Sequence, residues 1–339
     1  MKQKTITFTS VGKAELIESD LKPLSTDQVL VENEVSGISA GTERACLMDM
    51  PNLGDEPAGS FPKKLGYSGV GRVVEVGASV YQVKVGDRVL SYKGSTHSNY
   101  NILKGDEVLK LEDDSLPSEH AVFAVIGSFS LNGLRKARLE IGESAVVVGL
   151  GILGLLAVSL SRIAGASPVI ATDLSAARRK TALEMGAHQA FDPSAGDYIE
   201  QVKAASGGGA QVVVEVTGQS IALKQAFSFV KPFGRISLLG CTRVSDAAID
   251  FYQQVHRPGV EIVGAHGRAR PQMESRPHAW TWQDDILALW RFMADGRLDM
   301  GQILTEVYSP EEAPVVYKNL AEAPQDFPVG AVFDWRRLK

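Results

Sequence analysis

Cysteine is scarce in this 339-residue chain, and its scarcity excludes several kinds of site. The two cysteines, Cys46 and Cys241, lie far apart, and no Cys-x-x-Cys pair occurs, so a four-thiolate structural zinc site is excluded. A disulfide framework is excluded for the same reason, which suits a reducing compartment. The N-terminal residues alternate like a strand and hold no apolar signal core. We therefore expect a cytoplasmic protein.

A net positive charge and long apolar runs are also lacking. The formal net charge is −5, and the longest basic run, residues 178–180, is only three residues long. A nucleic-acid partner is therefore not expected. The longest apolar stretch, residues 146–158, is interrupted by glycines and is too short to span a bilayer. A membrane partner is not expected either.

Short alternating runs dominate the chain up to about residue 120. These runs are separated by glycines, which suit tight corners between strands, and they cover residues 29–35, 69–77 and 83–90. The pattern predicts a small, curled antiparallel barrel.

A different pattern follows, in which the apolar runs are continuous. Continuous runs are typical of parallel strands that are covered on both faces, and they occur at residues 145–148, 169–172, 212–216, 235–239 and 260–263. Helical patterns at residues 176–185 and 221–230 lie between them, so we predict an α/β fold with a doubly wound parallel sheet. We expect this domain to cover residues 121–266. Residues 267–339, with helices at 284–294 and 310–321 and a final strand at 329–335, should return to the β-rich domain of residues 1–120.

A glycine-rich turn joins the first parallel strand to its helix. Gly149 allows a tight turn, Gly151 lets the backbone approach a pyrophosphate, and Gly154 lets the helix pack closely on the strand. The pyrophosphate would then bind the amides at the positive end of the helix dipole. Since Asp173 ends the next strand, the sequence predicts a complete dinucleotide-binding unit.

Asp173 favours NAD over NADP. Its carboxylate can accept hydrogen bonds from both adenosine ribose hydroxyls and would repel a 2′-phosphate. Arg178 and Arg179 keep NADP open as the less favoured alternative, because arginines after this strand can bind a 2′-phosphate. Further cofactor contacts are predicted at the start of the helix, beside Asp173 and at later strand ends, namely Ile152, Leu153, Leu174, Arg178, Val216, Thr217, Gly240, Cys241 and His266.

These features together resemble the medium-chain dehydrogenase/reductase superfamily over essentially the whole chain. The markers are residues 66–77, the Val-Gly-Asp-Arg-Val stretch at 85–89, and residues 149–154 with Asp173. The resemblance implies a Rossmann domain beside a chaperonin-10-like catalytic domain. It also implies a homodimer or homotetramer formed through the Rossmann domains.

The chain departs from the zinc-dependent members of that superfamily. Where they carry a cysteine ligand this chain has Ser39, and where they carry Gly-His-Glu it has Gly66-Tyr67-Ser68. The third ligand position falls near residues 124–126, which are aliphatic. These residue types do not form a tetrahedral zinc site, so we expect chemistry without zinc or any other metal. Residues 36–43 are similar to a zinc-free branch that includes the bacteriochlorophyllide hydroxyethyl dehydrogenases.

Without zinc, a side chain must polarise the substrate oxygen and move its proton. Tyr67 is the first candidate. A phenol with an ordinary pKa near 10 would need a nearby cation, such as the nicotinamide ring or a lysine, and Lys93 and His97 are candidates in the chain. Ser39, Thr42 and Glu43 are further catalytic candidates.

Several of these assignments have open alternatives. Glu43 could instead pair with Arg44 or cap the following helix, and His97 could be structural. Trp280 and Trp282 are candidates for a wall of the substrate pocket or for burial at an interface.

Three functions fit the sequence. The leading hypothesis is a zinc-independent, NAD-dependent oxidoreductase that interconverts a secondary alcohol, such as a polyol or sugar derivative, with its carbonyl. The alternative is an NAD(P)H-dependent quinone or enone reductase. A third is a protein that binds the cofactor without turnover. In each case the partner is a small molecule.

Overall fold

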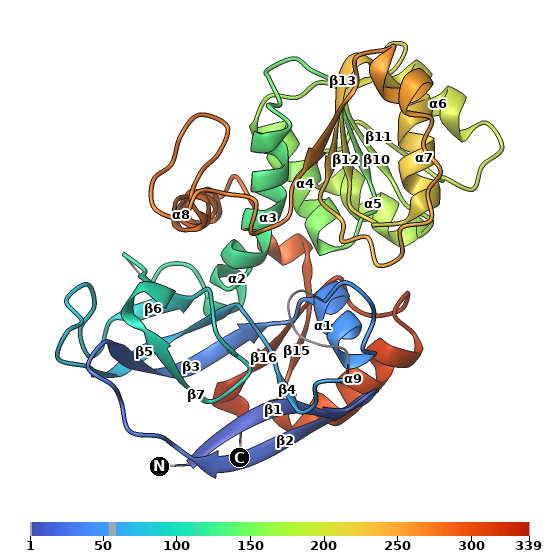
Figure 1. The fold of residues 1–339 in the computed structure, drawn as a ribbon. Coiled ribbons are helices and arrows are strands. Elements are labelled where there is room, and N and C mark those ends of the chain that lie inside the picture. The colour runs from blue at the N-terminus through green and yellow to red at the C-terminus, as the bar shows by residue number, and fades with distance from the viewer. Residues whose placement is uncertain (1, 54–58, 113, 339) are drawn as a thin grey trace. The chain divides into compact units, whose positions relative to one another are not determined.

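The computed structural model describes residues 2–53, 59–112 and 114–338 and contains two compact units (Figure 1). The first unit comprises residues Met1–Ile126 and Asp299–Lys339, and the second comprises Gly127–Leu298. The chain therefore leaves the first unit, forms the second, and returns. Among the described residues, no helix is both long enough and apolar enough to cross a membrane.

The first unit contains two sheets. The larger has the strand order β15-β16-β3-β5-β6-β8 with β7 on β3, and the smaller has the order β2-β1-β4. All pairs are antiparallel except β15 with β16. The predicted β-rich domain is confirmed. Its strands are β1 Lys2–Ser10, β2 Lys13–Asp20, β3 Gln28–Gly37, β4 Lys63–Lys64, β5 Gly69–Val76, β6 Arg88–Ser91, β7 Tyr100–Lys104, β8 Val108–Lys110, β15 Leu304–Tyr308 and β16 Gly330–Asp334.

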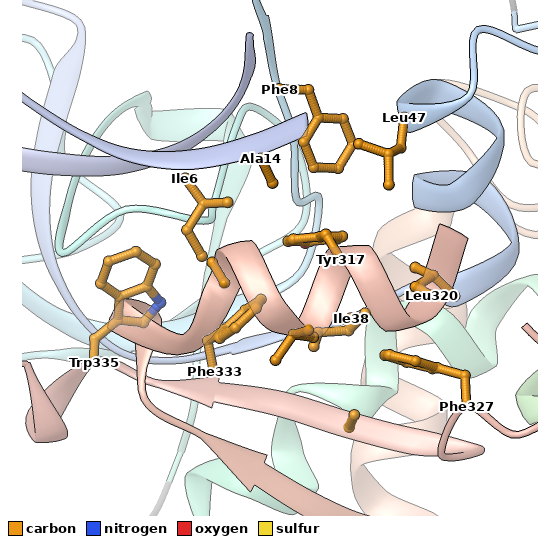
Figure 2. Packing of buried hydrophobic residues seen from close by; sticks show 13 residues of the cluster. Ile6, Phe8, Ala14, Ile38, Leu47, Tyr317, Leu320, Phe327, Phe333 and Trp335 are labelled. Carbon is orange, nitrogen blue, oxygen red and sulfur yellow. The ribbon is translucent and has the colours of Figure 1, made fainter. Parts of the chain in front are cut away.

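The C-terminal residues complete the core of this unit. Strand β16 pairs with β3, so that Val332 lies opposite Gly37, and helix α9 (Ala313–Glu322) packs on the same cluster. Figure 2 shows the ring of Phe333 between this helix and strand, and the ring of Tyr317 on the side of the helix that faces Phe8. Burial of large apolar side chains from both ends of the chain explains why the C-terminal segment returns here.

The second unit is built on a parallel sheet with the order β11-β10-β9-β12-β13-β14. The order reverses between β9 and β12, which is where open α/β sheets bind their ligands. The predicted doubly wound sheet is confirmed, and each continuous apolar run forms a strand because both of its faces are covered. The strands are β9 Ala145–Val148, β10 Val169–Thr172, β11 Gln189–Phe191, β12 Ala210–Glu215, β13 Val230–Leu238 and β14 Glu261–Gly264.

Helices cover both faces of this sheet. In Figure 1, α4 and α5 lie on one face, and α6 and α7 lie on the other, where they bury Tyr198 and Phe229. The helices of the chain up to the end of this unit are α1 Ala40–Leu47, α2 Ser118–Ala121, α3 Phe123–Lys136, α4 Ile152–Ile163, α5 Ala176–Glu184, α6 Tyr198–Ala205, α7 Ser220–Phe229 and α8 Trp282–Ala294.

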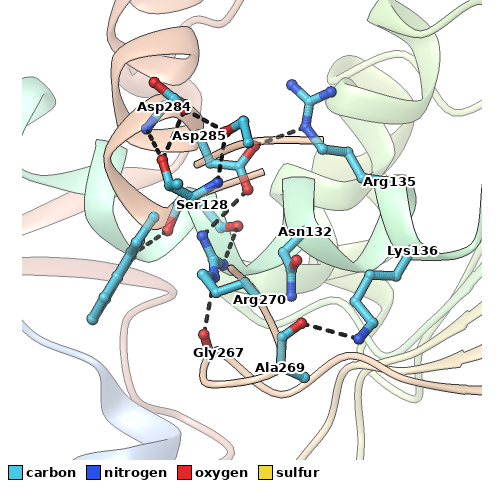
Figure 3. Close-up of polar contacts among 12 residues, drawn as sticks. Ser128, Asn132, Arg135, Lys136, Gly267, Ala269, Arg270, Asp284 and Asp285 are labelled. Carbon is cyan, nitrogen blue, oxygen red and sulfur yellow. Dashed lines mark hydrogen bonds and ion pairs between the residues drawn. The ribbon is translucent and has the colours of Figure 1, made fainter. Parts of the chain in front are cut away.

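The segment after β14 differs from its predicted place. We expected residues 267–339 to return to the β-rich domain, whereas residues up to Leu298 belong to the second unit. The reason is a buried ion-pair cluster, drawn in Figure 3, in which Asp285 binds Arg135 of α3 at 2.8 Å and Arg270 at 3.3 Å. These contacts hold residues 270–285 against α3.

The two tryptophans of this segment belong to the same cluster. Trp282 donates a hydrogen bond from Nε1 to Ser128 Oγ at 2.8 Å, and the Trp280 ring lies 3.5 Å from the Arg135 guanidinium. Both rings therefore contact side chains of α3. The roles expected from the sequence were a wall of the substrate pocket or burial at an interface.

Candidate functional site

The glycine-rich turn has the geometry that a dinucleotide requires. Gly149 has a φ of +92°, and a Cβ on Gly154 would lie 1.9 Å from the carbonyl oxygen of Gly149. Helix α4 can therefore pack against the turn only with glycine at position 154. A Cβ on Gly151, by contrast, would meet nothing within 4 Å. The backbone at Gly151 is thus open to a ligand, and no described side chain caps the helix that Gly151 begins.

Asp173 is held directly against this turn. Its Oδ2 accepts a hydrogen bond from the Leu150 amide at 2.7 Å, and its Oδ1 accepts one from the Ser175 amide at 2.8 Å. Each carboxylate oxygen has a second lone pair, which a ribose hydroxyl can use. The carboxylate is therefore placed beside the pyrophosphate position with its acceptor capacity available.

Arg179, one of the two arginines that left NADP open, is engaged within the protein. Its Nη1 donates to the carbonyl oxygens of Asp173 at 2.6 Å and Leu174 at 2.9 Å, and it also binds Asp192 at 3.0 Å. Arg178 lies in the first turn of α5, where its amide donates to Ser175 Oγ at 3.4 Å. A 2′-phosphate would thus compete with three acceptors for Arg179.

The loops after β12 and β13 lie beside the turn. Thr217 contacts Gly149 closely, since a Cβ on Gly149 would lie 2.6 Å from Thr217 Cγ2. The loop at Gly240 packs on Gly218 and Val216. The predicted residues Val216, Thr217 and Gly240 are therefore brought together at the carboxyl edge of the sheet. Leu174, Cys241 and His266 are exposed after β10, β13 and β14.

Glu215 was not among the predicted site residues, although it ends strand β12. It is buried and accepts hydrogen bonds from the amides of Thr217 at 2.7 Å and Gly218 at 3.1 Å, and from the Thr217 hydroxyl. Burial raises the pKa of its carboxyl, and these hydrogen bonds oppose that rise. An acid at the end of an otherwise apolar strand was the available sequence signal.

The predicted catalytic residues of the first unit include one direct pair. Ser39 precedes helix α1, and Tyr67 lies between β4 and β5. The Tyr67 hydroxyl donates a hydrogen bond to Ser39 Oγ at 2.5 Å. The fold thus brings two hydroxyl groups together. According to the family resemblance, they stand at the positions where zinc-dependent members carry cysteine and histidine.

The residues at these positions do not fit a zinc ion. Hydroxyl groups replace two ligands, and the third position falls on residues 124–126, which are fully buried and aliphatic. The described part of the chain holds no cluster of three or more His, Cys, Asp or Glu side chains arranged to bind a metal. A set of a serine, a tyrosine and an aliphatic residue offers no tetrahedral nitrogen or sulfur ligation.

Glu43 and His97 require a correction, because neither presents an atom for a substrate to contact. Glu43 is 1% exposed and His97 is fully buried. His97 Nε2 lies 3.2 Å from Glu43 Oε1, and Glu43 does not pair with Arg44 but accepts a hydrogen bond from the Ser39 amide at 2.8 Å. The carboxylate therefore stabilises the start of α1, which agrees with the helix-capping alternative.

Thr42 and Lys93 are separate from this buried pair. Thr42 is exposed in the first turn of α1. Lys93, one of two cations considered for lowering the pKa of Tyr67, lies over the ring of Tyr92 at 5.4 Å. The other, His97, contacts Ser36 and Glu43.

Comparison with known proteins supports the sequence resemblance. Residues 25–131 match the alcohol dehydrogenase GroES-like domain, and residues 153–282 match the zinc-binding dehydrogenase domain. The chain is 27% identical over 334 residues to D-guloside 3-dehydrogenase of Escherichia coli (strain K12), covering 93% of this chain and 95% of that protein. It is 28% identical over 278 residues to L-threonine 3-dehydrogenase of Pyrococcus furiosus, covering 73% and 75%.

The fold has close counterparts among solved structures. One is a zinc-binding dehydrogenase from Sinorhizobium meliloti 1021 bound to NADP, with a TM-score of 0.83 and 23% identity over 98% of this chain and 99% of that one. The chain therefore belongs to the zinc-type alcohol dehydrogenase-like members of the medium-chain dehydrogenase/reductase superfamily, a pyridine-nucleotide-dependent family, and is an alcohol dehydrogenase-like oxidoreductase.

Proposed function

We propose that this protein is a zinc-independent, NAD-dependent dehydrogenase that interconverts a secondary alcohol of a polyol or sugar derivative with its carbonyl. The observation that carries the proposal is the hydrogen bond between the hydroxyls of Tyr67 and Ser39. It supports the proposal because a hydroxyl pair can donate and accept a proton, and because the two residues occupy positions at which the zinc-dependent members are expected to carry zinc ligands. Support for the substrate class comes from the relative named as a D-guloside 3-dehydrogenase, which is similar over 93% of this chain.

The hydroxyl pair can move the proton that alcohol oxidation releases. In alcohol oxidation Tyr67 acts as the phenolate, its own proton having been released to water. The phenolate oxygen accepts the substrate hydroxyl proton, and the neutral phenol that results donates to Ser39 Oγ. When Tyr67 is a phenolate, rotation of the Ser39 hydroxyl turns Ser39 into a donor to the phenolate oxygen. In the reverse direction Tyr67 donates its proton to the carbonyl oxygen.

Bound NAD⁺ would supply the hydride acceptor, so that alcohol and NAD⁺ give carbonyl, NADH and one proton. The residues that would hold it are Gly149, Gly151 and Gly154 at the pyrophosphate and Asp173 at the adenosine ribose. Support for NAD rather than NADP comes from the carboxylate of Asp173 beside the turn and from the engagement of Arg179 with Asp192 and two carbonyl oxygens.

A substrate screen tests the reaction class. Reduction of NAD⁺ is measured with polyols, glycosides and other secondary alcohols, and oxidation of NADH is measured with quinones and enones. We expect NAD⁺ reduction with at least one polyol or glycoside. Turnover confined to quinones or enones would favour the reductase alternative, and cofactor binding without turnover on either panel would favour a binding protein.

Metal analysis tests the mechanism separately. Protein purified without added metal should contain less than stoichiometric zinc, and a chelator should leave its activity unchanged. One zinc per chain together with loss of activity in the chelator would contradict the zinc-independent mechanism.

We also propose that the protein is a homodimer or homotetramer assembled through the second unit. The edge strand β14 supports this, since it pairs only with β13 within the described part of the sheet. Sedimentation velocity should show a species larger than 36.4 kDa, and a monomer at all concentrations would contradict the proposal.

A further inference from the structure

We infer that Glu43 and Tyr317 are positioning residues for the Ser39–Tyr67 hydroxyl pair. Tyr317 comes from the opposite end of the chain, and its hydroxyl donates a hydrogen bond to Glu43 Oε2 at 2.7 Å. Glu43 in turn binds the backbone of Ser39. This inference rests on the proposed function of the hydroxyl pair, and it extends that function to residues that do not touch the substrate.

The Glu43 carboxylate has three donors from three parts of the chain. Oε1 accepts the Ser39 amide at 2.8 Å and lies 3.2 Å from His97 Nε2, while Oε2 accepts the Tyr317 hydroxyl. A buried carboxylate is stable only when its oxygens are satisfied in this way. The position of the Ser39 backbone is therefore coupled to the positions of His97 and Tyr317.

Tyr317 is a persistent donor in this arrangement. It is fully buried on α9, and its ring packs edge-on against Phe8 at 4.8 Å between centroids and lies 5.9 Å from Phe333. Burial, together with the neighbouring Glu43 carboxylate, raises the pKa of the Tyr317 hydroxyl well above its ordinary value. The hydroxyl therefore stays protonated, and the packed ring fixes its direction.

A second arm of the network reaches Glu43 through His97. The indole Nε1 of Trp335 donates to Ser36 Oγ at 2.8 Å, and Ser36 Oγ lies 2.8 Å from His97 Nδ1. With the Nε2–H tautomer of His97, Ser36 donates to Nδ1 and His97 donates to Glu43. Every polar atom of this arm then has a partner, so the network is complete and rigid.

The physical consequence is that the C-terminal segment determines where the Ser39 hydroxyl lies. Ser39 immediately precedes α1, and its amide is anchored by Glu43 four residues later. Loss of the anchor frees the start of α1, and a shift of about 1 Å at a reacting group is enough to lower a rate substantially. Tyr67 would keep its own position but lose its partner.

Kinetics of two variants test this inference. Tyr317→Phe removes one hydroxyl and keeps the ring packing, and we expect kcat to fall roughly tenfold while the dissociation constant for NADH is unchanged. Glu43→Ala should lower kcat more, whereas Glu43→Gln should restore much of it, because the amide oxygen still accepts the Ser39 amide. Loss of activity in Glu43→Gln equal to that in Glu43→Ala would overturn the positioning role.

A matched control separates positioning from general loss of stability. Tyr92→Phe makes the same change in the same unit, where the buried Tyr92 hydroxyl donates to the carbonyl oxygen of Asp106. We expect this variant to keep the wild-type kcat. If Tyr92→Phe and Tyr317→Phe lower kcat equally, the effect is one of packing and the inference fails.

Crystal structures of the wild type and Glu43→Ala provide a readout that does not depend on activity. We expect the separation of Ser39 Oγ and Tyr67 Oη to increase beyond hydrogen-bonding distance in the variant. An unchanged pair in Glu43→Ala would overturn the inference even if the protein is a dehydrogenase. A displaced pair in a protein without turnover on any alcohol would support the inference and reject the proposed function instead.

Discussion

The hydroxyl of Tyr67 lies 2.5 Å from that of Ser39, across two segments that meet only in the folded first unit. The two hydroxyls are within hydrogen-bonding distance, and either oxygen can act as donor or acceptor. In the proposed mechanism this pair, rather than a zinc ion, handles the substrate proton.

Replacing Tyr67 tests the pair directly. Tyr67→Phe removes the phenol hydroxyl that accepts and donates the substrate proton in the proposed mechanism. We therefore expect turnover to fall by a factor of about 10² or more. NADH binding should not change, because the dinucleotide residues lie in the other unit. Steady-state kinetics and fluorescence titration with NADH measure the two effects, and wild-type turnover would remove Tyr67 from the mechanism.

Two glycines of the turn should respond differently to alanine. Gly151 has ordinary backbone angles and open space at the Cβ position, so Gly151→Ala should fold normally but weaken NADH binding about tenfold or more. In Gly154→Ala the Cβ would collide with the Gly149 carbonyl oxygen, so the thermal unfolding temperature should also fall. Gly41→Ala, where a Cβ also meets nothing within 4 Å, is the control for an innocuous glycine replacement. If Gly151→Ala and Gly154→Ala lower the thermal unfolding temperature equally, the different roles assigned to these two glycines are contradicted.

Asp173 should determine the choice between NADH and NADPH. In Asp173→Ala the ribose hydroxyls lose an acceptor and a 2′-phosphate no longer faces a carboxylate. NADH binding should weaken by roughly tenfold. The ratio of the affinity for NADH to the affinity for NADPH should decrease. Fluorescence titration of both cofactors measures this, and tighter binding of NADPH to the wild type would reverse the predicted preference.

The buried Glu215 should make stability depend on pH. Burial raises its folded pKa above the ordinary value of 4.5, so the folded state binds the proton more tightly than the unfolded state does. The contribution of Glu215 to the free energy of unfolding is therefore fully present below pH 4.5 and is lost as the pH rises through the folded pKa. Urea unfolding of the wild type and of Glu215→Gln should be measured at several pH values. The difference between their free energies of unfolding should decrease as the pH rises through the folded pKa of Glu215. A difference that does not change with pH would contradict the prediction.

The ion-pair cluster of the second unit should contribute to stability. Asp285 is fully buried between Arg135 and Arg270, so Asp285→Asn leaves two guanidinium groups without a counter-charge and should cost about 3 kcal/mol. Asp295→Asn, which breaks an exposed pair with Arg297, should have a much smaller effect on the free energy of unfolding, because solvent screens that pair. Urea unfolding measures both, and equal costs would show that burial of the cluster is unimportant.

Local patterns in the sequence were sufficient for the main elements of the fold. The apolar run of residues 145–148 is strand β9 in the structure, and residues 169–172 are β10, because a strand covered on both faces needs apolar side chains throughout. The three glycines and Asp173 could be assigned for a similar reason, since their spacing follows from the turn and from the length of the intervening helix. The place of residues 267–298 could not be predicted this way, because it depends on how Asp285 meets two arginines far away in the chain.

The sequence by itself therefore determined the α/β class. It also predicted a dinucleotide turn and, through the resemblance, predicted that Ser39, Tyr67 and aliphatic residues stand in place of the usual zinc ligands. Only the tertiary structure decided which of the polar candidates meet. It brought Tyr67 to Ser39, and it turned Glu43 away from Arg44 towards His97 and Tyr317. The physical reason is that residue spacing governs contacts within one helix or strand, whereas contacts between distant segments depend on how their side chains pack around a shared core.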